Sequence, residues 1–204
     1  MKITVIGTGV LGLATATSLA GIGHDVLCLD RDENRVERLS RGLLPFEVPE
    51  YNELLADATE CRRLRFTSRF GDTIASAEAV ILAVDTLIHP DDSEDLRELW
   101  IATDLLVHDL RPDTLLVIKS AVPAGTDQRM ADRIDRMIWR AVDVVSEPFS
   151  PSAANWLDDV FMPHEIILGC RKQETADRLR QMYAAMPARV VVVTPESSLC
   201  SLTA

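Results

Sequence analysis

Short apolar runs alternate along the chain with segments in which apolar residues recur at helical spacing. The first run, Ile3–Ile6, ends in a glycine and is followed by a helical pattern over Leu11–Ile22. Unbroken apolar strands are typical of a parallel sheet covered on both faces. Further strands are expected at Asp25–Asp30, Ala79–Val84, Thr114–Lys119, Ala141–Val145, Glu165–Gly169 and Arg189–Thr194, and further helices at Glu33–Leu39, Glu94–Leu110, Gln128–Trp139 and Gln173–Ala185.

This alternation predicts a Rossmann-type α/β fold, with a doubly wound, mainly parallel sheet and helices on both of its faces. We expect one domain over residues 1–194. Residues 195–204 are expected to be a short C-terminal tail, the truncated start of a helix. The Pro, Asp and Ser content of Pro45–Tyr51 and Ile88–Ser93 predicts loops.

The net charge of the chain limits the classes of partner that it can bind. It has 21 Lys and Arg against 32 Asp and Glu, a net charge of −11. Such an excess repels phosphate backbones and anionic lipid, so we expect no nucleic acid and no membrane surface as partners. No apolar run approaches the roughly 20 residues of a membrane span. The four cysteines form no CxxC pair, which argues against a zinc site or a disulfide framework and favours the cytoplasm.

Other polar clusters offer weak candidate sites. Residues 91–95 are acidic apart from one serine, but they lack the spaced ligands of a known cation loop. We expect Asp92 or Ser93 to cap the following helix instead. The four histidines are scattered, without the spacing of a catalytic triad or a metal site. No metal site is therefore predicted.

The strongest motif lies at the first strand–helix turn. Gly7-Thr8-Gly9-Val10-Leu11-Gly12 reads GxGxxG, follows a strand and opens a helix. In this context Gly7 permits the tight turn, Gly9 lets the backbone approach a pyrophosphate, and Gly12 lets the helix lie close to the strand. The N–H groups at the start of the helix then face the phosphates. The alternative is a glycine-rich turn that binds no ligand.

Asp30 closes the second strand, 18 residues after Gly12. At that place a carboxylate accepts hydrogen bonds from the hydroxyls of the adenosine ribose. The same charge repels a 2′-phosphate, so we predict NAD as the cofactor rather than NADP. Arg31 follows directly and can soften that preference.

These residues carry a resemblance to a known family. Residues 1–30 closely resemble the start of the NAD domain of the UDP-glucose/GDP-mannose dehydrogenases. The likeness continues through RLRFTS at 63–68, AVILAVDT at 79–86, KSAVPAGT at 119–126, VVSEP at 144–148 and PHEIILG at 163–169.

The resemblance implies a function. The family oxidises the C6 hydroxyl of a nucleotide sugar to a carboxylate with two NAD, and it also has a central dimerising helix and a C-terminal nucleotide-sugar domain. Its cofactor positions carry over to Gly7, Gly9, Gly12 and Asp30, with Val10 and Leu11 inside the turn. Arg35 stands where the family has a basic residue near the adenosine, and Thr86 matches a threonine that approaches the cofactor. Asp85 replaces a glycine of that second turn, where a carboxylate weakens the binding of a pyrophosphate.

The family's catalytic positions do not carry over. Its cysteine-bearing GGSCFPKD segment has no counterpart in the chain, and its lysine position falls at about Ser201. Losing such groups removes the nucleophile and the acid–base chemistry, so no catalytic residue is predicted. Within the domain, the family's threonine, asparagine, glutamate and arginine are replaced by Ala121, Glu147, Phe149 and Glu165, and a later Glu-Gly pair by Ala153-Ala154.

Three hypotheses follow. The chain is a fragment or one part of a split nucleotide-sugar dehydrogenase, acting with a UDP-sugar and pairing with a second copy or a complementing dehydrogenase subunit. Alternatively, it is a non-catalytic relative that senses NAD(H) or binds a partner. A third option is a different NAD-dependent oxidation that uses Glu147 or His164.

Overall fold

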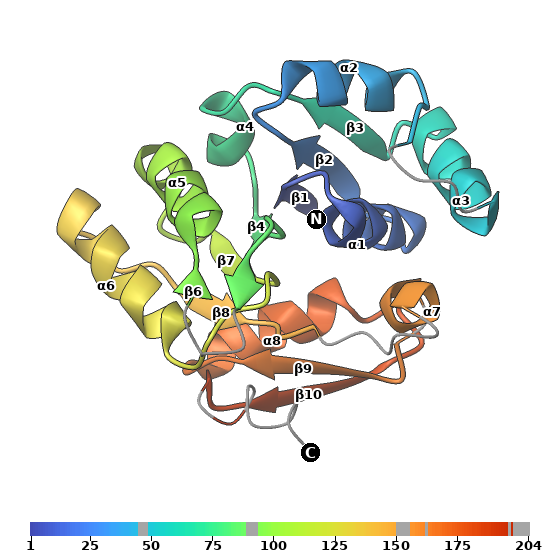
Figure 1. Ribbon diagram of the computed structural model, residues 1–204. Coiled ribbons are helices and arrows are strands. Elements are labelled where there is room, and N and C mark those ends of the chain that lie inside the picture. The colour runs from blue at the N-terminus through green and yellow to red at the C-terminus, as the bar shows by residue number, and fades with distance from the viewer. Residues whose placement is uncertain (45–48, 89–93, 150–155, 162, 196, 198–204) are drawn as a thin grey trace.

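The computed structural model describes residues 1–44, 49–88, 94–149, 156–161, 163–195 and 197. Its main feature is an eight-stranded sheet in the order β10-β9-β8-β7-β4-β1-β2-β3 (Figure 1). Neighbouring strands are parallel except β8 and β9. The predicted mainly parallel sheet is thus confirmed. The strands are β1 (Lys2–Ile6), β2 (Asp25–Leu29), β3 (Leu64–Thr67), β4 (Ala79–Leu82), β7 (Leu115–Ile118), β8 (Val144–Ser146), β9 (Glu165–Gly169) and β10 (Arg189–Val193).

Helices cover both faces of this sheet, and each face has its own apolar core. One core is shared by α1 (Val10–Gly21), α2 (Glu33–Ser40), α3 (Pro49–Glu60), α7 (Trp156–Phe161) and α8 (Gln173–Met182). The other is shared by α4 (Asp72–Ala75), α5 (Arg97–Leu106), a 3₁₀ helix (Val107–Asp109) and α6 (Thr126–Ile138).

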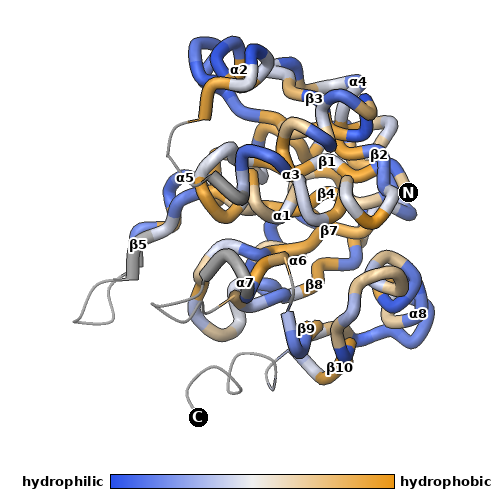
Figure 2. The backbone as a smooth tube through the Cα atoms, turned by 90° about the vertical axis from the view of Figure 1, so that its right-hand side faces the viewer, coloured by the Kyte–Doolittle hydropathy of each residue, from blue (hydrophilic) through white to orange (hydrophobic). Residues whose placement is uncertain are grey.

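The central strands explain why their sequences are apolar throughout. Every residue of β4 and β7 is buried. Successive side chains point to opposite faces, so Ile81 joins the core under α1 while Leu82 joins the core under α5. The hydrophobic tube segments accordingly run through the middle of the molecule (Figure 2).

The strand order locates a crevice. From β3 to β8 the parallel strands follow the Rossmann order, with β1 and β4 adjacent where the direction of winding reverses. Ligands of doubly wound sheets bind outside the carboxyl ends of the strands at this switch point. The glycine turn follows β1, so the fold puts it there.

Three local expectations were wrong. The expected loop Pro45–Tyr51 contains the start of α3, because Pro49 suits the first helical position and Tyr51 and Leu55 are buried one turn apart. The helix expected from Glu94 begins at Arg97, because Glu94–Asp95 (β6) pairs with Leu87–Ile88 (β5).

Helix α5 therefore has Leu96 at its N-cap, without a side-chain hydrogen bond. The expected cap by Asp92 or Ser93 was wrong, and both residues lie outside the described part of the chain. So do residue 196 and residues 198–204, which make up most of the expected tail.

Gly12 sets how closely α1 approaches the turn before it. A Cβ on Gly12 would lie 2.1 Å from the carbonyl oxygen of Gly7, a backbone atom. We therefore expect Gly12→Ala to lower the free energy of unfolding by about 2–3 kcal/mol, as overpacking does, measured by urea unfolding.

Gly21→Ala is the matched control on the same helix. Nothing lies within 4 Å of its Cβ position, so this change should be neutral or stabilising by up to ~1 kcal/mol. Equal stabilities of the two variants would contradict the proposed close approach at Gly12.

Candidate functional site

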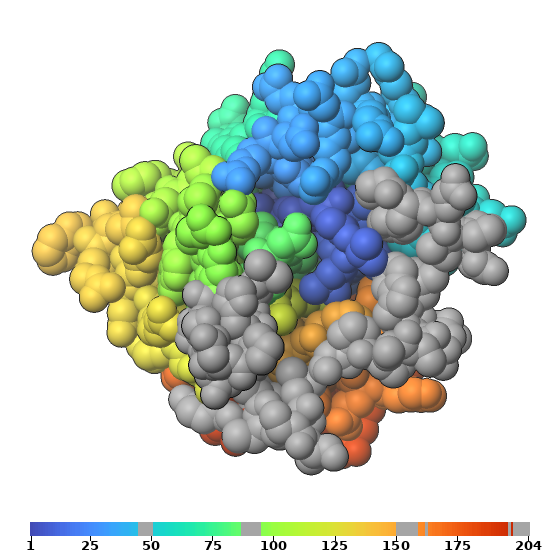
Figure 3. All heavy atoms as spheres, viewed as in Figure 1, coloured from blue at the N-terminus to red at the C-terminus, as the bar shows by residue number. Residues whose placement is uncertain are grey.

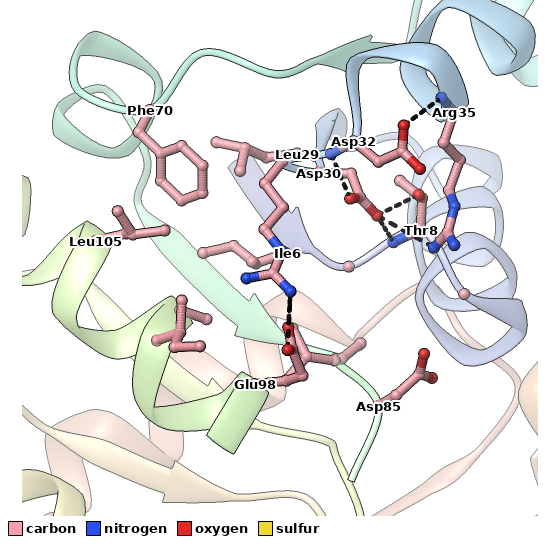
Figure 4. Close-up of a pocket in the computed structure, with 17 residues that line it drawn as sticks. Ile6, Thr8, Leu29, Asp30, Asp32, Arg35, Phe70, Asp85, Glu98 and Leu105 are labelled. Atoms are coloured by element: carbon pink, nitrogen blue, oxygen red, sulfur yellow. Dashed lines mark hydrogen bonds and ion pairs between the residues drawn. The ribbon is translucent and has the colours of Figure 1, made fainter. Parts of the chain in front are cut away.

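A pocket of about 280 Å³ opens at the switch point. It is lined by Gly7, Gly9 and Asp30, which the motif predicts, and by Arg35, which the resemblance implies. One wall of the pocket is apolar, and its side chains come from α5 and from the segment before α4 (Figure 4). That wall consists of Phe70, Ile101, Ala102 and Leu105. In the space-filling view, the first residues of the chain reach the surface between the segments of α2 and α5 (Figure 3).

The backbone of the turn is open toward this pocket. Gly7 has φ +102°, and a Cβ there would lie 2.5 Å from the carbonyl oxygen of Ala83. Gly9 is the N-cap residue of α1, and no side chain caps the helix. Uncapped N–H groups at the start of a twelve-residue helix attract an anion. The turn thus fits a pyrophosphate.

Asp30 is held in place by its neighbours. Its Oδ2 accepts hydrogen bonds from the N–H and the hydroxyl of Thr8, at 3.0 and 2.5 Å. Its Oδ1 accepts one from the N–H of Asp32, at 3.0 Å. Arg35 Nη1 lies 3.6 Å from Oδ2. Because a carboxylate oxygen has two lone pairs, Oδ1 retains one for a ribose hydroxyl.

These contacts also decide the charge of Asp30. Burial acts to raise its pKa, but the hydrogen bonds from Thr8 and Asp32 and the charge of Arg35 outweigh burial. The net pKa lies below the ordinary value of an aspartic acid. The group therefore stays ionised at neutral pH, as an acceptor for a sugar diol must.

Sequence reasoning missed several residues of the pocket. Thr8 occupies a variable position of the glycine motif, yet it donates twice to Asp30. Glu98 of α5, which no motif singles out, forms an ion pair with Arg31, Oε2 to Nη2 at 2.7 Å, and so joins two walls of the pocket. Phe70 gave no local signal, because only the packing of the chain brings it here.

Four predicted residues do not line this pocket. Val10 is exposed at the start of α1, Leu11 packs against the core, and Gly12 faces Gly7. Thr86 donates its hydroxyl to the carbonyl oxygen of Ala121, at 2.6 Å. It thereby ties the loop after β4 to the loop after β7, beside the pocket.

Asp85 introduces a negative charge at the turn. Its Oδ1 lies 3.3 Å from where a Cβ of Gly9 would be. A carboxylate this close to a bound pyrophosphate opposes its binding, by about 1 kcal/mol for a solvated pair some 4 Å apart.

We therefore expect Asp85→Asn to tighten NADH binding by roughly five-fold, measured by fluorescence titration at low ionic strength. Asp85→Glu is the control that keeps the charge and should bind NADH as the wild type does. Unchanged affinity in Asp85→Asn would contradict this electrostatic account. The gain should also shrink in high salt, which screens exposed charges.

A second polar cluster lies at the carboxyl ends of β7 and β8. The Lys119 ammonium donates to Oε1 of Glu147, and the Tyr183 hydroxyl donates to Oε2 at 2.6 Å. All three side chains are buried. Burial, with the charge and hydrogen bond of Glu147, raises the pKa of Tyr183 well above its ordinary value. Each oxygen of Glu147 thus accepts one hydrogen bond. His164, the other residue of the third hypothesis, is exposed.

None of the helices that the described residues form is both long and apolar enough to cross a membrane. No group of three or more His, Cys, Asp or Glu side chains among these residues comes together as a metal site. Ala153, Ala154 and Ser201 lie outside the described residues.

Residues 1–187 match the model of the UDP-glucose/GDP-mannose dehydrogenase family, NAD binding domain. The chain is 35% identical over 189 residues to UDP-glucose 6-dehydrogenase of Pseudomonas aeruginosa, covering 90% of this chain and 42% of that protein. The enzyme of Bacillus subtilis is 31% identical over 185 residues, with the same two coverages.

Solved structures give the same relationship. A UDP-glucose dehydrogenase from Pyrobaculum islandicum superposes with a TM-score of 0.89 at 29% identity, covering 98% of this chain and 48% of that one. A GDP-mannose dehydrogenase from Pseudomonas aeruginosa superposes with a TM-score of 0.90 at 20% identity, covering 100% of this chain and 48% of that one. At this identity the similarity shows a shared fold. The chain spans less than half the length of these proteins.

Proposed function

The chain belongs to the UDP-glucose/GDP-mannose dehydrogenase family through its NAD binding domain, and we propose that it holds NAD(H) in the pocket at the switch point. NAD is the cofactor of this domain. The proposed arrangement puts the pyrophosphate over the Gly7–Gly12 turn and the adenosine between Asp30 and the wall of α5. When bound, NAD⁺ accepts a hydride. One observation carries the proposal: Asp30 is ionised, fixed by Thr8 and Asp32, and retains a lone pair at the pocket.

The test is a fluorescence titration of the purified chain with NADH and, in parallel, with NADPH. We expect saturable NADH binding in the micromolar range and NADPH binding at least about ten-fold weaker, since the Asp30 carboxylate repels a 2′-phosphate. Equal affinities would mean that Arg31 and Arg35 compensate for that repulsion. Absence of NADH binding would refute the proposal.

We further propose that the domain is the cofactor-binding part of a nucleotide-sugar dehydrogenase acting on a UDP-sugar in the cytoplasm. Ala121 and Phe149 stand where the resemblance implies a threonine and a glutamate. Catalytic groups would then come from a complementing dehydrogenase subunit, because a second copy of this chain, in the homodimer that we also propose, carries the same replacements.

NADH formation from UDP-glucose and NAD⁺ tests this role, with the chain alone and with a complete dehydrogenase subunit of the family added. The chain alone should be inactive. It should raise the activity of an added subunit whose own Asp30-equivalent is disabled. If it does not, while NADH still binds, the chain is a sensor rather than part of an enzyme. Light scattering of the chain reports a homodimer separately.

A further inference from the structure

Charged side chains of both signs line the cofactor pocket. Among the residues that the structure describes, they are two arginines and four carboxylates: Arg31, Arg35, Asp30, Asp32, Asp85 and Glu98. In dinucleotide-binding domains, an arginine near the acid that closes the second strand accommodates the 2′-phosphate of NADP. The pocket therefore holds the kind of cation that NADP needs, beside an acid that favours NAD. The partners of the two arginines then decide how far these cations are available to a 2′-phosphate.

Arg35 is engaged by the acid itself. It lies in the first turn of α2, and its Nη1 is 3.6 Å from Oδ2 of Asp30. A 2′-phosphate that approached Arg35 would meet the Asp30 carboxylate at nearly the same place. The attraction of one group and the repulsion of the other therefore largely cancel.

Arg31 is engaged by a different carboxylate. It follows Asp30 directly in the chain, yet its Nη2 lies 2.8 Å from Oε1 and 2.7 Å from Oε2 of Glu98, the contact drawn at Glu98 in Figure 4. Glu98 belongs to α5, on the opposite wall of the pocket. A guanidinium binds carboxylates and phosphates through the same donors, so Glu98 and a 2′-phosphate would compete for Arg31.

Of these two partners, Glu98 has the more fixed place. It is the second residue of α5, where the helix dipole favours a carboxylate. The next residue, Leu99, is fully buried in the core that α5 shares. Arg31 lies between β2 and α2 and keeps 55% of its side chain exposed. The position of the carboxylate on α5 therefore determines where the arginine is held.

We propose that Glu98 is a specificity-determining residue, which engages Arg31, withholds that cation from a 2′-phosphate and so preserves the preference for NAD over NADP. This inference rests on the proposed binding of NAD(H) in the pocket. Glu98 acts twice in the same direction, because its own negative charge also lies in the lining of the pocket and repels a phosphate. The preference thus depends on a residue of α5 as well as on Asp30.

The preference is measured as the ratio of the dissociation constants for NADPH and NADH, from fluorescence titrations of the full chain at low ionic strength. Glu98→Gln keeps the size of the side chain and removes its charge. Because an exposed ion pair contributes modestly, we expect the ratio to fall by about five-fold, chiefly through tighter NADPH binding. An unchanged ratio, with NADH still bound, overturns this inference and leaves the proposed function in place. Absence of NADH binding by the wild type overturns both.

The double variant Arg31→Met/Glu98→Gln tests whether Glu98 acts through Arg31. With the arginine gone, no cation is released, so the ratio should lie within about two-fold of the wild type. A fall as large as in Glu98→Gln alone would overturn the inference. Glu37→Gln is the matched control, because Glu37 pairs with Arg41 on α2 and does not line the pocket. Its ratio should match the wild type within about two-fold, and a five-fold fall would mean that overall charge sets the preference.

Discussion

Replacing Asp30 with alanine is expected to weaken NADH binding by about 100-fold. The variant loses the acceptor for a ribose hydroxyl, and a hydrogen bond to a charged group contributes roughly 1.5–3 kcal/mol, or about 10- to 150-fold. It also loses the bonds that fix Thr8, and with it the glycine turn. NADH fluorescence titration measures the effect.

Asp25→Ala provides the matched control for this change. Asp25 begins the strand at whose end Asp30 lies, is exposed, and pairs with Arg65. The Asp25→Ala change removes the same charge, but at the opposite end of β2 from Asp30. NADH binding should therefore stay within about two-fold of the wild type. Thr8→Val should give an intermediate loss, because the carboxylate remains but one of its donors is gone. Wild-type affinity in Asp30→Ala would end the assignment of this residue to the ribose.

Replacing Lys119 with methionine is expected to lower the free energy of unfolding by about 3–5 kcal/mol. Glu147 is 3% exposed and pairs with Lys119, which is 8% exposed. Removing one member of a buried ion pair leaves the other charge without compensation. Urea unfolding of the purified variant measures the loss, and the remaining bond from Tyr183 is too weak to prevent it.

The double variant Lys119→Met/Glu147→Gln should regain most of that stability, since an uncharged amide can still accept from Tyr183. Lys172→Met is the control for a solvent-exposed pair. Lys172 pairs with Asp143 and keeps 63% of its side chain exposed, so its loss should be no more than about 1 kcal/mol. If Lys119→Met and Lys172→Met lose the same free energy of unfolding, then the burial of the Lys119–Glu147 pair does not make that pair more important for stability.

Much of the fold was predictable because buried parallel strands leave a strong local signal. The runs that became β4 and β7 are apolar at every position, and Thr4 is the one polar residue among the buried positions of β1. By contrast, β3 has only Leu64 fully buried, and it lies at the edge of the sheet. Helices α4 and α7 are four and six residues long, too short for a helical period to be recognised.

The sites divide in a similar way. Glycines and an acid at fixed spacing identify a dinucleotide turn because each acts through the local backbone: Gly7 by its positive φ, Asp30 by its place at the end of a strand. Side chains that come together from distant segments leave no fixed spacing in the sequence by which they could be recognised. Glu98 and Phe70 in the cofactor pocket, and Tyr183 beside Glu147, belong to this second group.

The amino-acid sequence by itself determined the alternation of strands and helices, the glycine turn, and the acid that follows it. These features depend on side-chain period, on φ angles and on neighbours a few residues away. Only the tertiary structure decided that Thr8 and Asp32 use up most of the Asp30 carboxylate, that Asp85 points at the turn, and that Lys119, Glu147 and Tyr183 share one buried cluster. Such contacts arise where packed layers bring separate segments together, and burial sets their strength.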